Sequence, residues 1–168
     1  MARIELDLAS LLVGRDTVLR QYVETVTPLY DYVIVDTAPT LGLLTVNALA
    51  AADSVIIPVT PKFLDAKGLE LLLKTIFRVK RQINPALQID GILISMIDQR
   101  TNISKKNFSR INEAYGEHIR IFENMIPFSV KAKEASDNFK SIIEYLPDHK
   151  ISLAYKAFTQ EVLNNGKQ

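Results

Sequence analysis

An apolar run that ends in an aspartate is the first pattern in this sequence that could do chemistry. Residues 32–35 are apolar, Asp36 follows them, and Thr37 and Pro39 stand in the next turn. If the run is a strand of a parallel sheet, Asp36 reaches the carboxyl edge, where open α/β folds bind ligands. Mg²⁺ prefers oxygen ligands and usually keeps several waters. We therefore expect Asp36 to hold magnesium through water; the alternative is a carboxylate that only caps its loop.

Basic residues form three clusters that could contact phosphates. The first is spaced as on one helix face, and the other two follow farther along the chain; they are Lys74, Arg78 and Arg81, then Lys105, Lys106 and Arg110, then Lys131, Lys133 and Lys140. Clusters of this kind are most often solvated helix surfaces. Single phosphate contacts are modest and sensitive to salt, so binding of nucleic acid would need several clusters joined across a dimer.

Composition indicates one soluble globular domain over residues 1–168. The chain is 48% apolar and 23% charged, and 20 Lys and Arg nearly balance 19 Asp and Glu. The net charge therefore favours neither a nucleic acid nor a membrane as partner. Because the sequence has no cysteine, it excludes disulfides and thiolate metal sites, as is usual in a reducing cytoplasm. His118 and His149 stand apart from other residues that could bind a metal, so we expect no histidine metal site. From the absence of cysteine we expect a cytoplasmic protein.

The order of short apolar runs and longer helical patterns predicts an α/β fold with a mostly parallel sheet. We expect strands at Tyr32–Asp36, Ser54–Val59 and Gly91–Ile97, with a weaker one at Ile119–Ile126. We expect helices from a cap at Asp16 to Val26, over Leu43–Ala51 and Ala66–Ile83, from a cap at Ser104 to Tyr115, and from about Val130 and Ser152. Helices on both faces of the sheet would make three layers.

Several blocks in the same order resemble the ParA/Soj partition ATPases. They are "YDYVIVDTAPTLGLLTVNALAAADSVIIPV", "AKGLELLLKTI", "INPALQIDGILISMIDQRTN" and "IPFSVKAKEAS", and "LDLASLLVGRDTVLRQYVETV" is similar to the segment that precedes them. The resemblance covers nearly the whole chain. It implies a P-loop NTPase fold, ATP and Mg²⁺ as cofactors, a nucleotide-bound dimer, non-specific DNA binding and a centromere-binding ParB-like partner.

The glycine-rich phosphate loop of that family is not found in these 168 residues. The sequence contains no G-x-x-x-x-G-K-[ST] pattern, and its six glycines are scattered. This loop supplies the backbone amides and the lysine that bind the phosphates. We therefore expect a partial domain that lacks the first strand and its loop and does not hydrolyse ATP alone. The alternative is that this chain binds no cofactor.

The resemblance also assigns candidate residues farther along. Pro127 and Phe128 correspond to the segment that contacts adenine, and Asp98 opens a "DxRTN" block that would border the nucleotide or the dimer face. Their alternatives are a strand-to-helix turn with Phe128 in the core, and a turn-forming role for Asp98. Thr37 would lie near the metal or satisfy a turn amide. Lys131 and Lys133 occupy a block where relatives carry arginine and contact DNA.

Two points remain open at this level. In the family the strand that feeds the phosphate loop lies beside the aspartate strand, so we expect an uncovered edge there. This edge pairs with a second copy or a full-length relative, or a rearranged N-terminal segment fills the gap. Three functions compete: a ParA-type partition ATPase, a nucleotide-independent module that binds DNA or protein, and a membrane-associated relative of the MinD type. The C-terminal "AYKAFTQEVLNNGKQ" lacks the basic and bulky apolar character of a membrane anchor, which disfavours the third.

Overall fold

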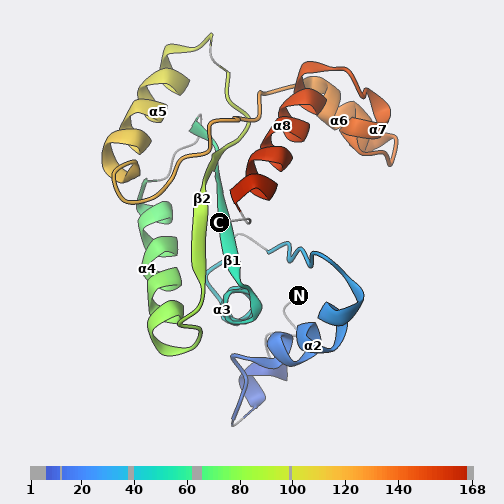
Figure 1. The fold of residues 1–168 in the computed structure, drawn as a ribbon. Helices are drawn as coiled ribbons and strands as arrows, with labels where there is room; N and C mark the ends of the chain where they lie inside the picture. Colours follow the sequence, from blue (N-terminus) through green and yellow to red (C-terminus); the bar gives the residue numbers. More distant parts are fainter. Residues whose placement is uncertain (1–6, 12, 38–39, 62–65, 99, 166–168) are drawn as a thin grey trace. The chain divides into compact units, whose positions relative to one another are not determined.

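The computed structural model describes residues 7–11, 13–37, 40–61, 66–98 and 100–165 (Figure 1). Their contacts divide the chain into two compact units. The first consists of Met1–Val55 and Asp65–Gln88, and the second of Ile56–Leu64 and Ile89–Gln168. Each unit has its own buried side chains and its own polar contacts.

The first unit is helical. After a helical stretch at residues 7–10, it contains α2 (Val18–Val26), the short 3₁₀ helix η1 (Thr27–Leu29), α3 (Leu43–Ala51) and α4 (Ala66–Gln82). The interior side of α4 is a stripe at helical spacing, formed by Leu69, Leu73, Ile76 and Val79. The predicted helix over Ala66–Ile83 is thus confirmed to within one residue, and Leu43–Ala51 is confirmed with its predicted bounds.

Two strands pair in parallel. They are β1 (Ser54–Val59) and β2 (Gln88–Ile94). Gln88 N donates to Asp53 O, and Ser95 N donates to Val59 O, so the pairing advances in the same direction along both chains. Single parallel bridges extend the same pattern from Ile92 to Ile121 and from Ile97 to Pro127. The predicted strand Gly91–Ile97 therefore starts three residues earlier and stops at Ile94, and Ile119–Ile126 contributes a single bridge at Ile121 rather than a strand.

Helices flank these strands in the second unit. They are α5 (Asn102–Tyr115), α6 (Val130–Asp137), α7 (Ile142–Tyr145) and α8 (Lys150–Asn165). The core joins the strands to α8, which lies beside them in Figure 1: Leu93, Phe122, Ile126 and Ile151 are buried together, and Phe158 packs against them. The rings of Phe122 and Phe158 meet edge to face at 5.0 Å and 87°. A parallel sheet flanked by helices confirms the α/β class.

The predicted strand over Tyr32–Asp36 is wrong for this structure. Residues 32–37 have no regular secondary structure, and the side chains of Tyr32 and Ile34 are 69% and 92% exposed. A strand is stabilised by a neighbour that completes its backbone hydrogen bonds and covers one face. No strand among the described residues lies beside this segment. The apolar pattern of residues 32–35 favours a strand, but the described structure provides no neighbouring strand with which the segment could pair.

Both predicted helix caps are also displaced. The residue before α2 is Thr17, with no side-chain cap, whereas Asp16 lies 3.8 Å from Arg15 Nε. At α5 the capping residue is Thr101, whose Oγ1 accepts from Ser104 N at 3.3 Å. Ser104 is thus the third residue of the helix rather than its cap. In the described part of the chain, no helix combines the length and apolarity that a bilayer crossing requires.

Candidate functional site

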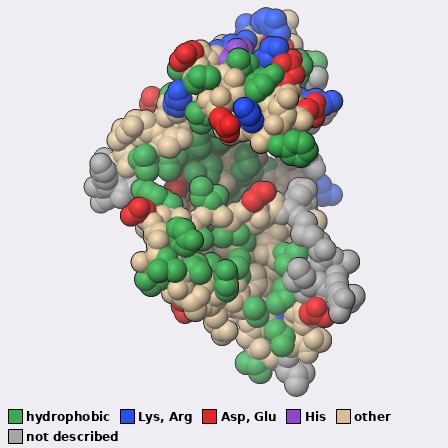
Figure 2. Space-filling view, turned by 90° about the vertical axis from the view of Figure 1, so that its right-hand side faces the viewer, with side chains coloured by type: hydrophobic (Ala, Val, Ile, Leu, Met, Phe, Trp, Pro, Cys, Tyr) green, Lys and Arg blue, Asp and Glu red, His purple; other side chains and the backbone are tan. Residues whose placement is uncertain are grey.

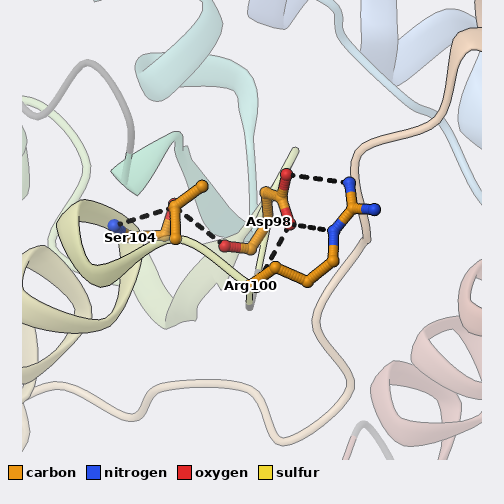
Figure 3. A network of polar contacts seen from close by, with 4 residues as sticks. Asp98, Arg100 and Ser104 are labelled. Atoms are coloured by element: carbon orange, nitrogen blue, oxygen red, sulfur yellow. Dashed lines mark hydrogen bonds and ion pairs between the residues drawn. The ribbon is translucent and has the colours of Figure 1, made fainter.

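Asp98 lies directly after the Ile97–Pro127 bridge and is held by Arg100 (Figure 3). Its Oδ1 accepts from Arg100 N at 3.1 Å and from Nε at 3.0 Å, and its Oδ2 accepts from Nη2 at 3.1 Å. Hydrogen bonds from the Arg100 side chain and then from its backbone lower the pKa of Asp98. The carboxylate is therefore charged and largely committed to its own turn, as the turn-forming alternative requires.

The same turn starts α5. Thr101 N and Oγ1 both lie within hydrogen-bonding distance of Asp98 O, at 3.1 and 3.0 Å. Thr101 Oγ1 also lies 2.8 Å from the hydroxyl of Ser104, which is 1% exposed. The Asp98 turn and the first turn of α5 consequently form one polar unit, and the Arg100 side chain within it is 87% exposed.

Pro127 and Phe128 lie on the segment next to Asp98. Ile97 N donates to Ile126 O at 3.1 Å, and Phe128 N donates to Ile97 O at 2.9 Å. The structure thus brings Asp98 together with Pro127 and Phe128 at the end of the parallel ladder. The Phe128 side chain is 48% exposed, so it is not the core residue of the alternative interpretation. An exposed aromatic ring offers a flat face of the kind that contacts a planar base.

Glu161 of α8 holds the preceding segment, and sequence analysis gave no indication of it. Its Oε2 accepts from Asn124 N at 3.0 Å and from Asn124 Nδ2 at 2.8 Å, and its Oε1 accepts from Glu123 N at 3.0 Å. These partners are 37 or 38 residues away, and no local pattern marks such a contact. The carboxylate fixes the chain three residues before Pro127.

Asp36 and Thr37 belong to the first unit and are exposed. Pro39 lies outside the described residues. Among those residues, no three His, Asp or Glu side chains gather as a metal site. A lone carboxylate fits Mg²⁺ held mainly by water and substrate phosphates, which is common for this ion. The fit is therefore partial: Asp36 would provide one oxygen ligand, and the described part of the chain shows no phosphate cradle.

The predicted nucleic-acid residues are exposed, but one is paired. Lys105 and Lys106 lie on α5, and Lys133 lies on α6. Lys131 Nζ lies 2.7 Å from Glu134, and the hydrogen bond to that carboxylate raises the pKa of the lysine. Figure 2 shows basic and acidic side chains interspersed at the upper end of the view. On the face that Figure 2 shows, acidic side chains lie near the basic ones.

Comparison with known proteins decides the family. The model of the AAA domain family matches residues 1–89, which is more than half of the chain. The chain belongs to the AAA domain family. Asp36, α3 and α4 all lie within the matched part.

Relatives within this family include the sporulation initiation inhibitor protein Soj of Bacillus subtilis, 36% identical over 166 residues, which are 99% of this chain and 64% of that protein. The chromosome partitioning protein ParA of Myxococcus xanthus is 38% identical over 150 residues, or 89% of this chain and 52% of that protein. These relatives confirm the resemblance to ParA/Soj partition ATPases. The AAA-family chain thus spans about half to two thirds of their length.

Two solved structures have folds similar to that of this chain. Cobyrinic acid a,c-diamide synthase from Mycobacterium smegmatis, with bound ADP and magnesium, has a TM-score of 0.82 at 28% identity and covers 99% of this chain and 60% of that one. Apo McdA of Cyanothece has a TM-score of 0.81 at 20% identity, covering 96% and 64%. The second likeness speaks for the fold alone. Together they support the P-loop NTPase type of α/β fold.

Proposed function

We propose that this chain carries part of a ParA-type partition ATPase, whose complete form uses ATP and Mg²⁺ to segregate DNA. The observation that carries the proposal is the likeness to Soj over 99% of the chain. The bound ADP and magnesium of the synthase with a similar fold support a nucleotide and Mg²⁺ as cofactors. The proposed location is the cytoplasm.

In this proposal each unit carries its own group of cofactor-binding residues. In the first unit Asp36 is a water-mediated magnesium ligand, and Thr37 and Pro39 belong to the same group; in the second unit Asp98, Pro127 and Phe128 border the base. Magnesium would shield the phosphate charge, and the carboxylate would orient its waters. A phosphate-binding loop is needed for the reaction, and the 168 residues contain no such motif. The chain by itself is therefore a binding partner rather than a catalyst.

The proposed partners are non-specific DNA, a centromere-binding ParB-like protein and a second copy of a ParA-type chain. Lys105, Lys106, Lys131 and Lys133 are the proposed DNA contacts because all four are exposed on helices of the second unit. Lys133 is favoured over Lys131, because Glu134 already occupies Lys131. Each lysine would contribute a salt-sensitive phosphate contact, so only a dimer would bind DNA firmly.

Nucleotide binding is tested by titration of the purified chain with a fluorescent ATP analogue, with and without Mg²⁺. We expect weak binding that Phe128→Ala reduces and no turnover above that of Asp36→Ala. Magnesium-dependent turnover that Asp36→Ala removes would contradict the expectation that the chain alone is inactive. Binding unaffected by Phe128→Ala would remove this residue from the site.

DNA binding is tested separately with a labelled duplex. Charge reversal at Lys133 should weaken binding more than reversal at Lys131, and Lys105→Glu with Lys106→Glu should add to the loss. Unchanged affinity in all of these variants would reject this surface. If these variants lose DNA affinity in assays that contain no nucleotide, the result would favour the alternative function, a nucleotide-independent DNA-binding module.

A further inference from the structure

Helix α4 has two faces of opposite character. Leu69, Leu73, Ile76 and Val79 are buried on one side. Lys74, Phe77, Arg78 and Arg81 recur at i, i+3, i+4 and i+7, so their side chains lie in one row on the opposite side. We name this row the α4 stripe. All of its residues belong to the first unit.

The α4 stripe lies in a segment of unbalanced charge. Residues 71–84 contain two lysines and two arginines and no Asp or Glu. Glu70 neutralises Lys74, with Nζ and Oε1 2.5 Å apart. Arg78, Lys80 and Arg81 have no ion-pair partner among the described residues. Two full guanidinium charges of the stripe are therefore available to an anion.

An aromatic ring stands among these cations. The Phe77 side chain is 54% exposed, on a helix whose other face is already apolar. It lines an open surface hollow of about 590 Å³ together with Lys74, Arg78, Lys80 and Arg81. Nearly half of the Phe77 side chain is covered, and the remainder presents an apolar aromatic surface among cations that a stacked partner would cover.

We propose that the α4 stripe is a binding site for single-stranded nucleic acid, in which Arg78 and Arg81 contact phosphates and the Phe77 ring stacks on an unpaired base. Proteins that bind single strands without sequence preference combine a cationic track with aromatic platforms in this way. Arginine also presents a planar group that can pair with a phosphate through two hydrogen bonds.

The combination of groups favours a single strand over other anions. In a duplex the bases are stacked inside, so the ring of Phe77 would find no base face and only the phosphate contacts would remain. A membrane surface would need a wider apolar face than one aromatic side chain. An acidic peptide would satisfy the arginines but would leave the ring without a specific role. The α4 site is independent of the lysines proposed above for duplex DNA, which lie on α5 and α6.

The test uses a fluorescein-labelled oligothymidine of twenty nucleotides and fluorescence anisotropy with the full chain. We expect Phe77→Leu, which keeps apolar bulk but removes the ring, to weaken binding roughly tenfold, and Phe77→Tyr to bind like the parent. Arg78→Gln with Arg81→Gln should lower the slope of log affinity against log salt by about 1.4, since each single-strand phosphate contact contributes about 0.7. A duplex of the same sequence should compete poorly.

Matched controls decide between this site and general attraction. Lys150 of α8 is exposed and has no ion-pair partner among the described residues, so Lys150→Gln removes a positive charge outside the basic clusters and should leave binding unchanged. Equal affinity of Phe77→Leu and the parent, or an equal loss in Lys150→Gln, would overturn the proposal. Binding of the chain to anionic vesicles would also overturn the proposal, if the oligonucleotide did not displace the vesicles and the Phe77→Leu variant still bound them. Unchanged circular dichroism spectra would show that the variants are folded.

Discussion

Arg120 and Glu161 form an ion pair that joins the segment after α5 to α8: Nη2 of the arginine lies 2.8 Å from Oε1 of the glutamate. The Glu161 side chain is only 10% exposed, and it also accepts from the backbone amides of Glu123 and Asn124. Arg120 in turn lies over the ring of Phe122, 5.2 Å from its centroid. One carboxylate thereby anchors the strand-like segment whose continuation carries Pro127 and Phe128.

Replacement of Glu161 by glutamine should destabilise the second unit. The new amide group would turn an N–H toward a backbone N–H of Glu123 or Asn124, and the charge on the acceptor would be lost. We expect a decrease of about 1.5–3 kcal/mol in the free energy of unfolding, measured in urea. Glu144→Gln is the matched control, because Glu144 is 62% exposed and lies 3.8 Å from Lys140. An equal loss in both variants would contradict the anchoring role.

The Glu161 contacts should also make stability depend on pH. Burial alone raises the pKa of this carboxyl, but the amides of Glu123 and Asn124, the Asn124 side chain and Arg120 together lower it below the ordinary value of 4.5. The folded state therefore binds the proton less well than the unfolded state. Its stabilisation is complete above pH 4.5 and is lost as the pH falls through the folded pKa. The gap in unfolding free energy between the parent and Glu161→Gln should narrow between pH 5 and pH 3, about the range of carboxyl titration; a constant gap would be evidence against this linkage.

Asn47 should stabilise the first unit as strongly as Glu161 stabilises the second. It is 3% exposed; its Oδ1 accepts from Leu19 N at 3.2 Å, and its Nδ2 donates to Arg15 O at 2.8 Å and to Leu43 O at 3.0 Å. Asn47→Leu would leave these backbone groups without a partner, and we expect a loss of about 2–4 kcal/mol. Faster hydrogen exchange at the Leu19 amide would locate the effect. Asn138→Ala, at an exposed site, should change stability much less; a loss equal to that of Asn47→Leu would argue against a special role for the buried amide.

The parts of this fold that sequence predicts are those with a clear local pattern and a partner element present in the described structure. β1 and α3 have their predicted bounds because their apolar runs are framed by turn residues and are covered by neighbouring elements. Residues 32–36 show the converse case. Their apolar pattern is as strong as that of β1, yet the described structure gives them no neighbouring strand, and pattern alone cannot provide one.

The candidate site divides in the same way. Asp98, Pro127 and Phe128 could be named because the resemblance to the partition ATPases assigns them, and the Ile97 backbone does bring them together. Glu161 and Asn47 could not be named, because all of their partners except Leu43 lie 28 to 41 residues away and any exposed polar residue on a helix has the same local signature. The exchange of Ser104 for Thr101 as the cap has a simpler cause: both have a hydroxyl, and helix bounds from sequence are uncertain by a few residues.

Gly91 of β2 should tolerate no side chain. Its φ is +153°, and a Cβ there would lie 2.8 Å from Arg120 O and 3.0 Å from the Phe122 ring. Gly91→Ala would force the Arg120 segment away from β2, and we expect a loss of about 2–4 kcal/mol in urea unfolding. Gly14→Ala is a useful comparison, because its φ of +76° is also strained but nothing lies within 4 Å of the added Cβ. If the two variants are equally destabilised, backbone strain rather than the close contact is responsible.

Asp98 and Thr101 should separate binding from folding within one turn. Thr101→Ala removes the hydroxyl that caps α5, so we expect a loss of about 1 kcal/mol in the free energy of unfolding. Asp98→Asn weakens only an ion pair in which the arginine is 87% exposed, so its urea midpoint should match that of the parent. The same fluorescent ATP analogue then gives the functional comparison. Weaker binding in Asp98→Asn at unchanged stability would support a place for Asp98 at the nucleotide edge, whereas unchanged binding would leave this carboxylate with the turn alone.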